Sequence, residues 1–163
     1  MKKSRKIIMS VVAVILSSII FITSASAMYV ASGNFVTDYV SAYDYVCITN
    51  DDEWVYAAVD FDYNEDSTPV EFVDVSIAGS VYYYYDRHGS PAYTDYFSVS
   101  RSVRPDQTED SDEVYAMVAY RPGYPEILID VTITYTINFS DASPLQYIVT
   151  YSCDVGLDSF SRN

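Results

Sequence analysis

The stretch EILIDVTITYTINF, residues 126–139, determines the fold class of this chain. Its odd-numbered positions are apolar or aromatic, from Ile127 to Phe139. Its even-numbered positions are mostly polar, from Glu126 to Asn138. Because successive side chains of a β-strand point to opposite faces, this period of two predicts one long strand with a buried face and a solvated face.

The same alternation recurs on both sides of this segment. A second clear strand is predicted near residues 54–63, where Val55, Ala57, Val59 and Phe61 form the inward face. Further strands are predicted at 28–36, 39–49, 73–77, 81–85, 97–103, 114–120 and 147–153. Turn-forming residues separate them, among them Ala78-Gly79-Ser80 between 73–77 and 81–85. Eight or nine short strands with short connections predict an all-β fold, namely an antiparallel β-sandwich of the immunoglobulin-like or jelly-roll-like kind.

Residues 1–27 have the pattern of a secretory signal peptide and are expected to form an N-terminal helix before cleavage. A basic start at Lys2 to Lys6 is followed by an apolar run from Ile7 to Ile22 and by the small residues Ala25-Ser26-Ala27. The apolar run is short for a bilayer span, which takes about 20 apolar residues. We therefore expect one secreted domain, residues 28–163, that is free of the membrane after cleavage, and the style of the signal indicates a bacterial source.

The charge excludes some functions and favours others. The chain has 9 Lys+Arg against 23 Asp+Glu, a formal net charge of −14. Removal of residues 1–27 takes four basic residues and no acidic one, which leaves −18. Nucleic-acid binding is not expected, because it needs basic side chains at the phosphates. Such a surface favours a basic partner, or the charge serves solubility alone.

Two cysteines, Cys47 and Cys153, are predicted to form a disulfide. Export would place them in a compartment where disulfides persist. Each cysteine lies on the same face of its predicted strand as tyrosines at neighbouring alternate positions, and we assign both cysteines to inward faces. The alternative is a pair of unbonded buried thiols.

One acidic segment is compatible with calcium. Oxygen side chains stand at the spacing of calcium-loop positions, namely Asp60, Asp62, Asn64, Asp66 and Glu71. Glu65 stands where an EF-hand has glycine, and Pro69 and the strand-like flanks also argue against that motif. The alternative is an acidic hairpin turn with solvated charges, so no cofactor is assigned.

Exposed aromatic residues are the predicted binding residues. Trp54, Tyr56, Tyr82, Tyr84 and Tyr115 each lie opposite the apolar stripe of their strand. Aromatic side chains combine a large contact area with a polar group. We therefore expect a binding module that recognises a carbohydrate or cell-surface ligand. The alternatives are an acidic interaction factor, such as an inhibitor or an immunity or toxin-associated protein, and a small carboxylate-dependent glycoside hydrolase. Catalysis is not the expectation, since the single histidine, His88, lies in a predicted turn.

Overall fold

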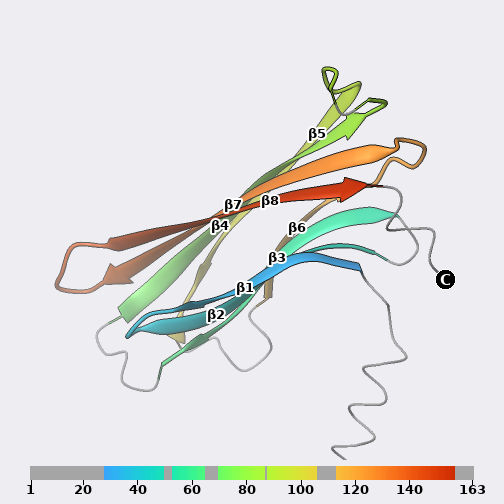
Figure 1. The fold of residues 1–163 in the computed structure, drawn as a ribbon. Helices are drawn as coiled ribbons and strands as arrows, with labels where there is room; N and C mark the ends of the chain where they lie inside the picture. Colours follow the sequence, from blue (N-terminus) through green and yellow to red (C-terminus); the bar gives the residue numbers. More distant parts are fainter. Residues whose placement is uncertain (1–27, 50–52, 65–69, 87, 106–112, 157–163) are drawn as a thin grey trace, which may run out of the picture.

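Eight strands form two four-stranded antiparallel sheets that pack face to face (Figure 1). The computed structural model describes residues 28–49, 53–64, 70–86, 88–105 and 113–156. The strands are β1 (Met28–Val36), β2 (Val40–Ile48), β3 (Trp54–Tyr63), β4 (Val70–Tyr84), β5 (Tyr93–Val103), β6 (Glu113–Ala119), β7 (Glu126–Phe139) and β8 (Leu145–Gly156). Sheet A has the order β1-β2-β3-β6, and sheet B has the order β5-β4-β7-β8. The predicted all-β antiparallel sandwich is confirmed, and the predicted signal peptide lies outside the described residues.

The connections define the topology. Strands that follow one another pair within sheet A (β1-β2 and β2-β3) and within sheet B (β4-β5 and β7-β8), whereas the chain changes sheets after β3, β5 and β6. An immunoglobulin domain places its second and third strands in different sheets, so the immunoglobulin-like alternative does not fit. The two four-stranded sheets confirm the antiparallel sandwich, and the jelly-roll-like assignment stays a prediction, because a jelly roll is defined by its Greek-key connections and not by the number of its strands.

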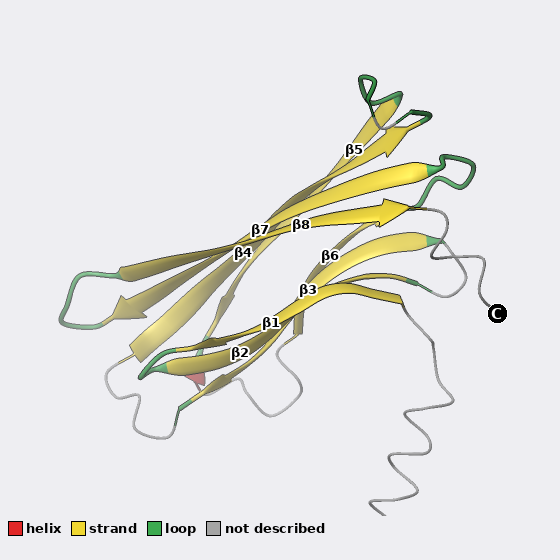
Figure 2. Cartoon of the chain, viewed as in Figure 1, coloured by secondary structure: helices red, strands yellow, loops and turns green. Residues whose placement is uncertain are grey.

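Strands account for most of the described chain (Figure 2), and these residues contain no α-helix. Within the described part of the chain, no helix is long and apolar enough to cross a membrane.

The core lies between the two sheets and uses the alternation that the sequence shows. On β7 the residues from Ile127 to Ile137 at odd positions are all buried, and on β3 so are Val55, Ala57, Val59 and Phe61. Burying one such aliphatic or aromatic side chain contributes about 1.5–3 kcal/mol. The strand predicted at residues 126–139 is confirmed, with the same bounds.

On β2 the inward face is the opposite of the predicted one. Val40, Ala42, Asp44, Val46 and Ile48 point into the core. The register explains this orientation, because these residues are paired in turn with the inward residues of β3. A shift of one residue in a strand exchanges its two faces, so the tyrosines of β2 lie on the outer face of sheet A.

The same exchange corrects the disulfide prediction. Both cysteines are buried, and they are not bonded to each other. Cys153 lies in the core between the sheets, whereas Cys47 is on the outer side of sheet A opposite Tyr56. The backbone of sheet A separates the two side chains, so a bridge is geometrically excluded in this fold.

The predicted turn at Ala78-Gly79-Ser80 is also wrong, because β4 runs unbroken from Val70 to Tyr84. Gly79 is paired with Phe97 of β5, and the Phe97 ring occupies the space where a side chain would lie. A Cβ atom at position 79 would be 2.2 Å from Cζ of Phe97. Glycine here permits the close approach of a neighbouring ring, which is one of its uses within a strand.

One polar group interrupts the core. The Asp44 carboxylate is 1% exposed and accepts hydrogen bonds from the hydroxyl groups of Tyr135 on β7 and, at 3.2 Å, of Tyr151 on β8. The Tyr135 ring stacks on Phe35 with 4.4 Å between centroids. This cluster joins the two sheets by hydrogen bonds, as a buried polar group requires.

Substitution of Gly79 tests the packing of β4. Gly79→Ala should lower the free energy of unfolding by about 1–3 kcal/mol, because the added methyl group overpacks the site against the Phe97 ring. Urea unfolding measures the change. Gly156→Ala is the matched control, since nothing lies within 4 Å of a Cβ at that position. Equal stability of the two variants would contradict the assigned packing.

The pH dependence of stability tests the environment of Asp44. Burial raises the pKa of Asp44, and the hydrogen bonds from Tyr135 and Tyr151 offset this only in part. The folded protein therefore binds the proton of Asp44 more tightly than the unfolded chain, whose aspartates titrate at about pH 3.9. The free energy of unfolding should therefore decrease as the pH rises from the pKa of Asp44 in the unfolded chain to its raised pKa in the folded protein.

Asp44→Asn isolates this contribution because the amide does not ionise. Urea unfolding should show that the free energy of unfolding of the wild type, minus that of Asp44→Asn, decreases as the pH rises through this window. Tyr135 and Tyr151 stay neutral there, since burial raises the pKa of both and brings that of Tyr151 to about 12. Parallel curves would show that Asp44 titrates as it does in the unfolded chain.

Candidate ligand-binding face

The outer face of sheet A carries a group of large side chains from three neighbouring strands. We call this group the tyrosine face; it comprises Tyr43 and Tyr45 on β2, Trp54 and Tyr56 on β3, and Glu113, Tyr115 and Met117 on β6. The β2-β3-β6 register brings them together, because Tyr45, Ala58 and Tyr115 lie in one row across the sheet. Ala58 is fully buried although it points away from the core. The surrounding large side chains therefore form a second packed layer.

Four tyrosine rings are in continuous contact along this face. The centroid distances are 5.8 Å from Tyr43 to Tyr45, 6.0 Å from Tyr45 to Tyr56, and 5.4 Å from Tyr56 to Tyr115. The last pair is stacked, with 21° between the ring planes. Such pairs contribute about 0.5–1.5 kcal/mol beyond the area that they bury, so neighbouring rings hold one another in position before any ligand binds.

Glu113 fixes the hydroxyl ends of two of these rings. The Tyr56 hydroxyl donates to Oε1 of Glu113 at 2.7 Å, and the Tyr45 hydroxyl donates to the same oxygen. Burial, followed by these bonds to Glu113, raises the pKa of both tyrosines. Both hydroxyls therefore remain protonated donors at any physiological pH.

The tyrosine face is open to solvent. Tyr43 is 41% exposed, Trp54 37%, Met117 46% and Tyr115 48%. A contiguous exposed patch of this kind is typical of an interaction surface, because single exposed apolar side chains are common and clusters are not.

Negative charge borders the aromatic rings. Asp60 and Asp62 project from the outer side of β3, and Asp60 is paired with Glu113. A hollow of about 230 Å³ beside Tyr43 is lined in part by both aspartates and by Asn34. The four strands of sheet A contain no Lys, Arg or His.

The structure divides the five predicted binding residues between two faces. Trp54, Tyr56 and Tyr115 come together on the tyrosine face, as described above. Tyr82 and Tyr84 lie on the outer side of sheet B, where Tyr82 is paired with Thr94 and Leu128. Residue alternation identifies an outward position on a strand, but it does not show to which sheet the strand belongs.

Tyr43 and Tyr45 are not among the predicted binding residues, because their face of β2 was expected to point into the core. Met117 and Glu113 are not among them either, although both alternate in phase with Tyr115 on β6.

The predicted calcium residues are only partly described. Asp66 lies outside the described residues, and Glu71 is an exposed residue of β4. The Asn64 side chain has a structural contact, since its amide nitrogen donates to the carbonyl oxygen of Thr37 at 2.8 Å. Among the described residues, no three His, Cys, Asp or Glu side chains are grouped so that they could hold a metal ion.

A second tyrosine cluster lies near the β6-β7 connection and uses its rings for internal contacts. Tyr83 contacts Tyr93, Tyr120 and Tyr124 there. The guanidinium group of Arg121 lies 3.7 Å from the Tyr93 ring centroid, and its Nε donates to Asp95 at 2.7 Å. A cation from the chain itself thus covers the Tyr93 ring, whereas Tyr85, which contacts Tyr124 in this cluster, is 70% exposed. The tyrosine face differs from this cluster in having no cation over its rings among the described contacts.

No protein-family model, curated protein or solved structure matches this chain. The structure alone therefore describes this chain, as an antiparallel sandwich of two four-stranded sheets with a solvent-exposed tyrosine face.

The two cysteines should behave as unreactive free thiols. Burial, aided by the charge of Glu113, raises the pKa of Cys47 to about 11, and burial also raises the pKa of Cys153. The reactive thiolate is therefore scarce at about pH 8. Without reductant, iodoacetamide should label neither thiol rapidly in the native protein and both in guanidinium chloride. Intact mass reads the result, and an unlabelled denatured protein that reacts only after reduction would contradict the structure.

Proposed function

We propose that this chain is a secreted binding module that recognises a carbohydrate or cell-surface ligand through the tyrosine face. The observation that carries the proposal is the continuous contact of four tyrosine rings across β2, β3 and β6, with Trp54 and Met117 exposed beside them. Rings that are already fixed lose little conformational entropy when a ligand binds, which favours affinity. Exposed tyrosine and tryptophan supply both contact area and hydrogen-bonding groups.

A basic protein partner is the second candidate, and one observation favours it. Asp60, Asp62 and Glu113 border the rings, and the strands of sheet A carry no basic residue. Among the described contacts, the cation beside them is Arg101 of β5, whose Nη1 donates to the carbonyl oxygen of Glu113 at 3.5 Å. A Lys or Arg side chain of a partner would meet ring faces and carboxylates together, and both attract a cation.

Truncation of the exposed anchors tests the proposal. Trp54→Ala and Tyr115→Ala should each weaken ligand binding about tenfold or more, because loss of an interface anchor commonly costs about 2 kcal/mol or more. Trp54→Ala should leave the melting temperature close to that of the wild type, since its side chain lies outside the core between the sheets. Tyr115→Ala should lower it modestly, because the stacked pair with Tyr56 contributes about 0.5–1.5 kcal/mol. Glycan-array binding and pull-down from native culture, repeated with each variant, provide the measurement.

The matched control is Tyr85→Ala, which removes a 70% exposed tyrosine away from the tyrosine face. Undiminished binding by both Trp54→Ala and Tyr115→Ala would refute the proposal. Salt separates the two candidates: binding to a neutral glycan should be nearly independent of ionic strength, whereas docking of a basic partner should weaken as salt screens the charges.

A further inference from the structure

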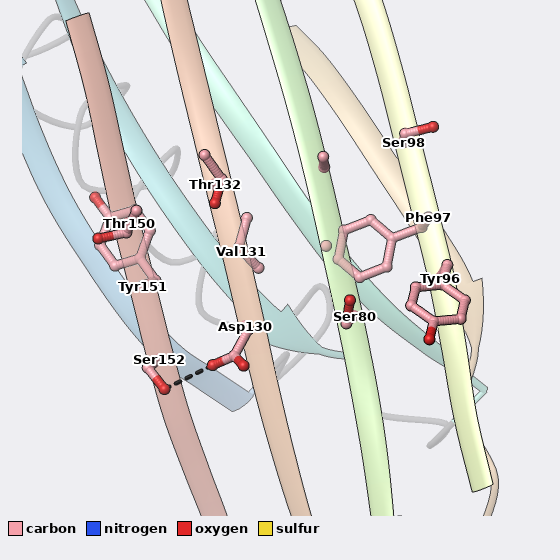
Figure 3. A pocket seen from close by; sticks show the side chains of 12 residues that line it. Ser80, Tyr96, Phe97, Ser98, Asp130, Val131, Thr132, Thr150, Tyr151 and Ser152 are labelled. Atoms are coloured by element: carbon pink, nitrogen blue, oxygen red, sulfur yellow. Dashed lines mark hydrogen bonds between the residues drawn. The ribbon is translucent and has the colours of Figure 1, made fainter.

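Sheet B has a trough on its outer face, on the opposite side of the sandwich from the tyrosine face (Figure 3). The trough has a volume of about 730 Å³ and is lined by residues from all four strands of the sheet. Its hydroxyl groups come from Ser80, Ser98, Thr132, Thr150 and Ser152. We call these five residues, together with Asp130, the hydroxyl trough.

The trough lies over two adjacent rows of outward side chains, most of which are small. In one row Ser80 lies between Tyr96 and Asp130, and in the next Ala78 lies between Ser98 and Thr132. The following row contains larger side chains, with Tyr82 paired to Leu128. Tyr82 and Leu128 therefore border the trough at one end. Ala78 is an exposed residue within it.

The lining has one carboxylate and no cation. The Ser152 hydroxyl donates to Oδ1 of Asp130 at 2.6 Å, which holds the carboxylate in place (Figure 3). An anionic ligand would meet the negative charge of Asp130 without a compensating base. A wholly apolar ligand would deprive the hydroxyl groups of water without replacing their hydrogen bonds.

An exposed ring completes the set of groups. Tyr96 is 73% exposed and lies in the same row as Ser80, Asp130 and Ser152. Its ring offers a flat apolar surface next to hydroxyl donors and acceptors. A pyranose ring has the complementary chemistry, because it presents hydroxyl groups at its edge and C–H groups on its faces.

We propose that the hydroxyl trough and Tyr96 form a second binding site, which takes a neutral oligosaccharide. The site uses no residue of the tyrosine face and does not depend on the function proposed for that face. A chain that binds on both outer faces would be bivalent, and it could link two ligands on opposite sides of the sandwich.

Three variants of the trough test this proposal with defined probes. Ala78→Trp fills the trough from an exposed position, Tyr96→Ala removes the ring, and Asp130→Asn removes the charge. The probes are neutral tetrasaccharides of glucose, xylose, mannose and N-acetylglucosamine, with a tetrasaccharide of galacturonic acid as the anionic comparison. An array identifies the bound probe, calorimetry gives its dissociation constant, and the melting temperature of each variant checks its fold.

The wild type should bind at least one neutral tetrasaccharide more tightly than the galacturonate. Binding should be lost in Ala78→Trp and weakened at least about tenfold in Tyr96→Ala and Asp130→Asn, with Tyr85→Ala as the unaffected control. If Ala78→Trp does not fold, the other two variants decide.

Three results would overturn the proposal. They are the binding of no neutral tetrasaccharide, tighter binding of the galacturonate, and full binding by Tyr96→Ala and Asp130→Asn. Loss of saccharide binding in Trp54→Ala alone would place the saccharide on the tyrosine face, so the two proposals fail separately.

Discussion

The pairing of β4 with β7 is the constraint on which the rest of the sandwich depends. It extends from Val70 opposite Phe139 to Tyr84 opposite Glu126, along nearly the full length of both strands. The inward residues of β4 lie opposite inward residues of β7 throughout, as Ile77 lies opposite Ile133. Because both strands are central in sheet B, this apolar seam determines which side of the sheet receives sheet A. Tyr135 then extends from β7 to the buried Asp44 of β2 and joins the two sheets.

The two outer faces follow from this seam but differ in chemistry. Once the apolar sides are turned inward, alternation leaves each strand's remaining side chains to solvent. On sheet A those side chains include the contacting rings of the tyrosine face, and on sheet B five of the eight side chains in two adjacent rows beside Tyr82 and Leu128 are serine or threonine. One sandwich therefore presents a raised aromatic surface on one side and a polar hollow on the other. This difference in shape and polarity suits them to different ligands.

The strands and most of the core could be predicted from local alternation, as β7 and the inward side of β3 show. The errors arose where a contact distant in sequence overrides the local signal. Ala78-Gly79-Ser80 has the composition of a turn, but Phe97 packs over Gly79 and the strand continues. On β2, tyrosines favoured one face as the core, whereas the buried side includes Asp44, whose partners Tyr135 and Tyr151 come from the other sheet. The disulfide prediction failed for the same reason, and the separation of Tyr82 from Trp54 required knowledge of which strands pair.

The hydrogen bonds of the carboxylates connect the composition of the chain to its surface. With 23 acidic and 9 basic residues, there are too few cations to pair with the carboxylates. Four of them instead accept bonds from neutral hydroxyl groups: Asp44 from Tyr135 and Tyr151, Glu113 from Tyr45 and Tyr56, Asp74 from Ser102, and Asp130 from Ser152. The ion pair of Arg121 with Asp95 differs from these. A hydroxyl donor satisfies the hydrogen-bonding needs of a carboxylate but does not cancel its charge. The fold can therefore hold its acidic groups in place while the molecule keeps a negative field, which attracts cationic partners over a distance limited by salt.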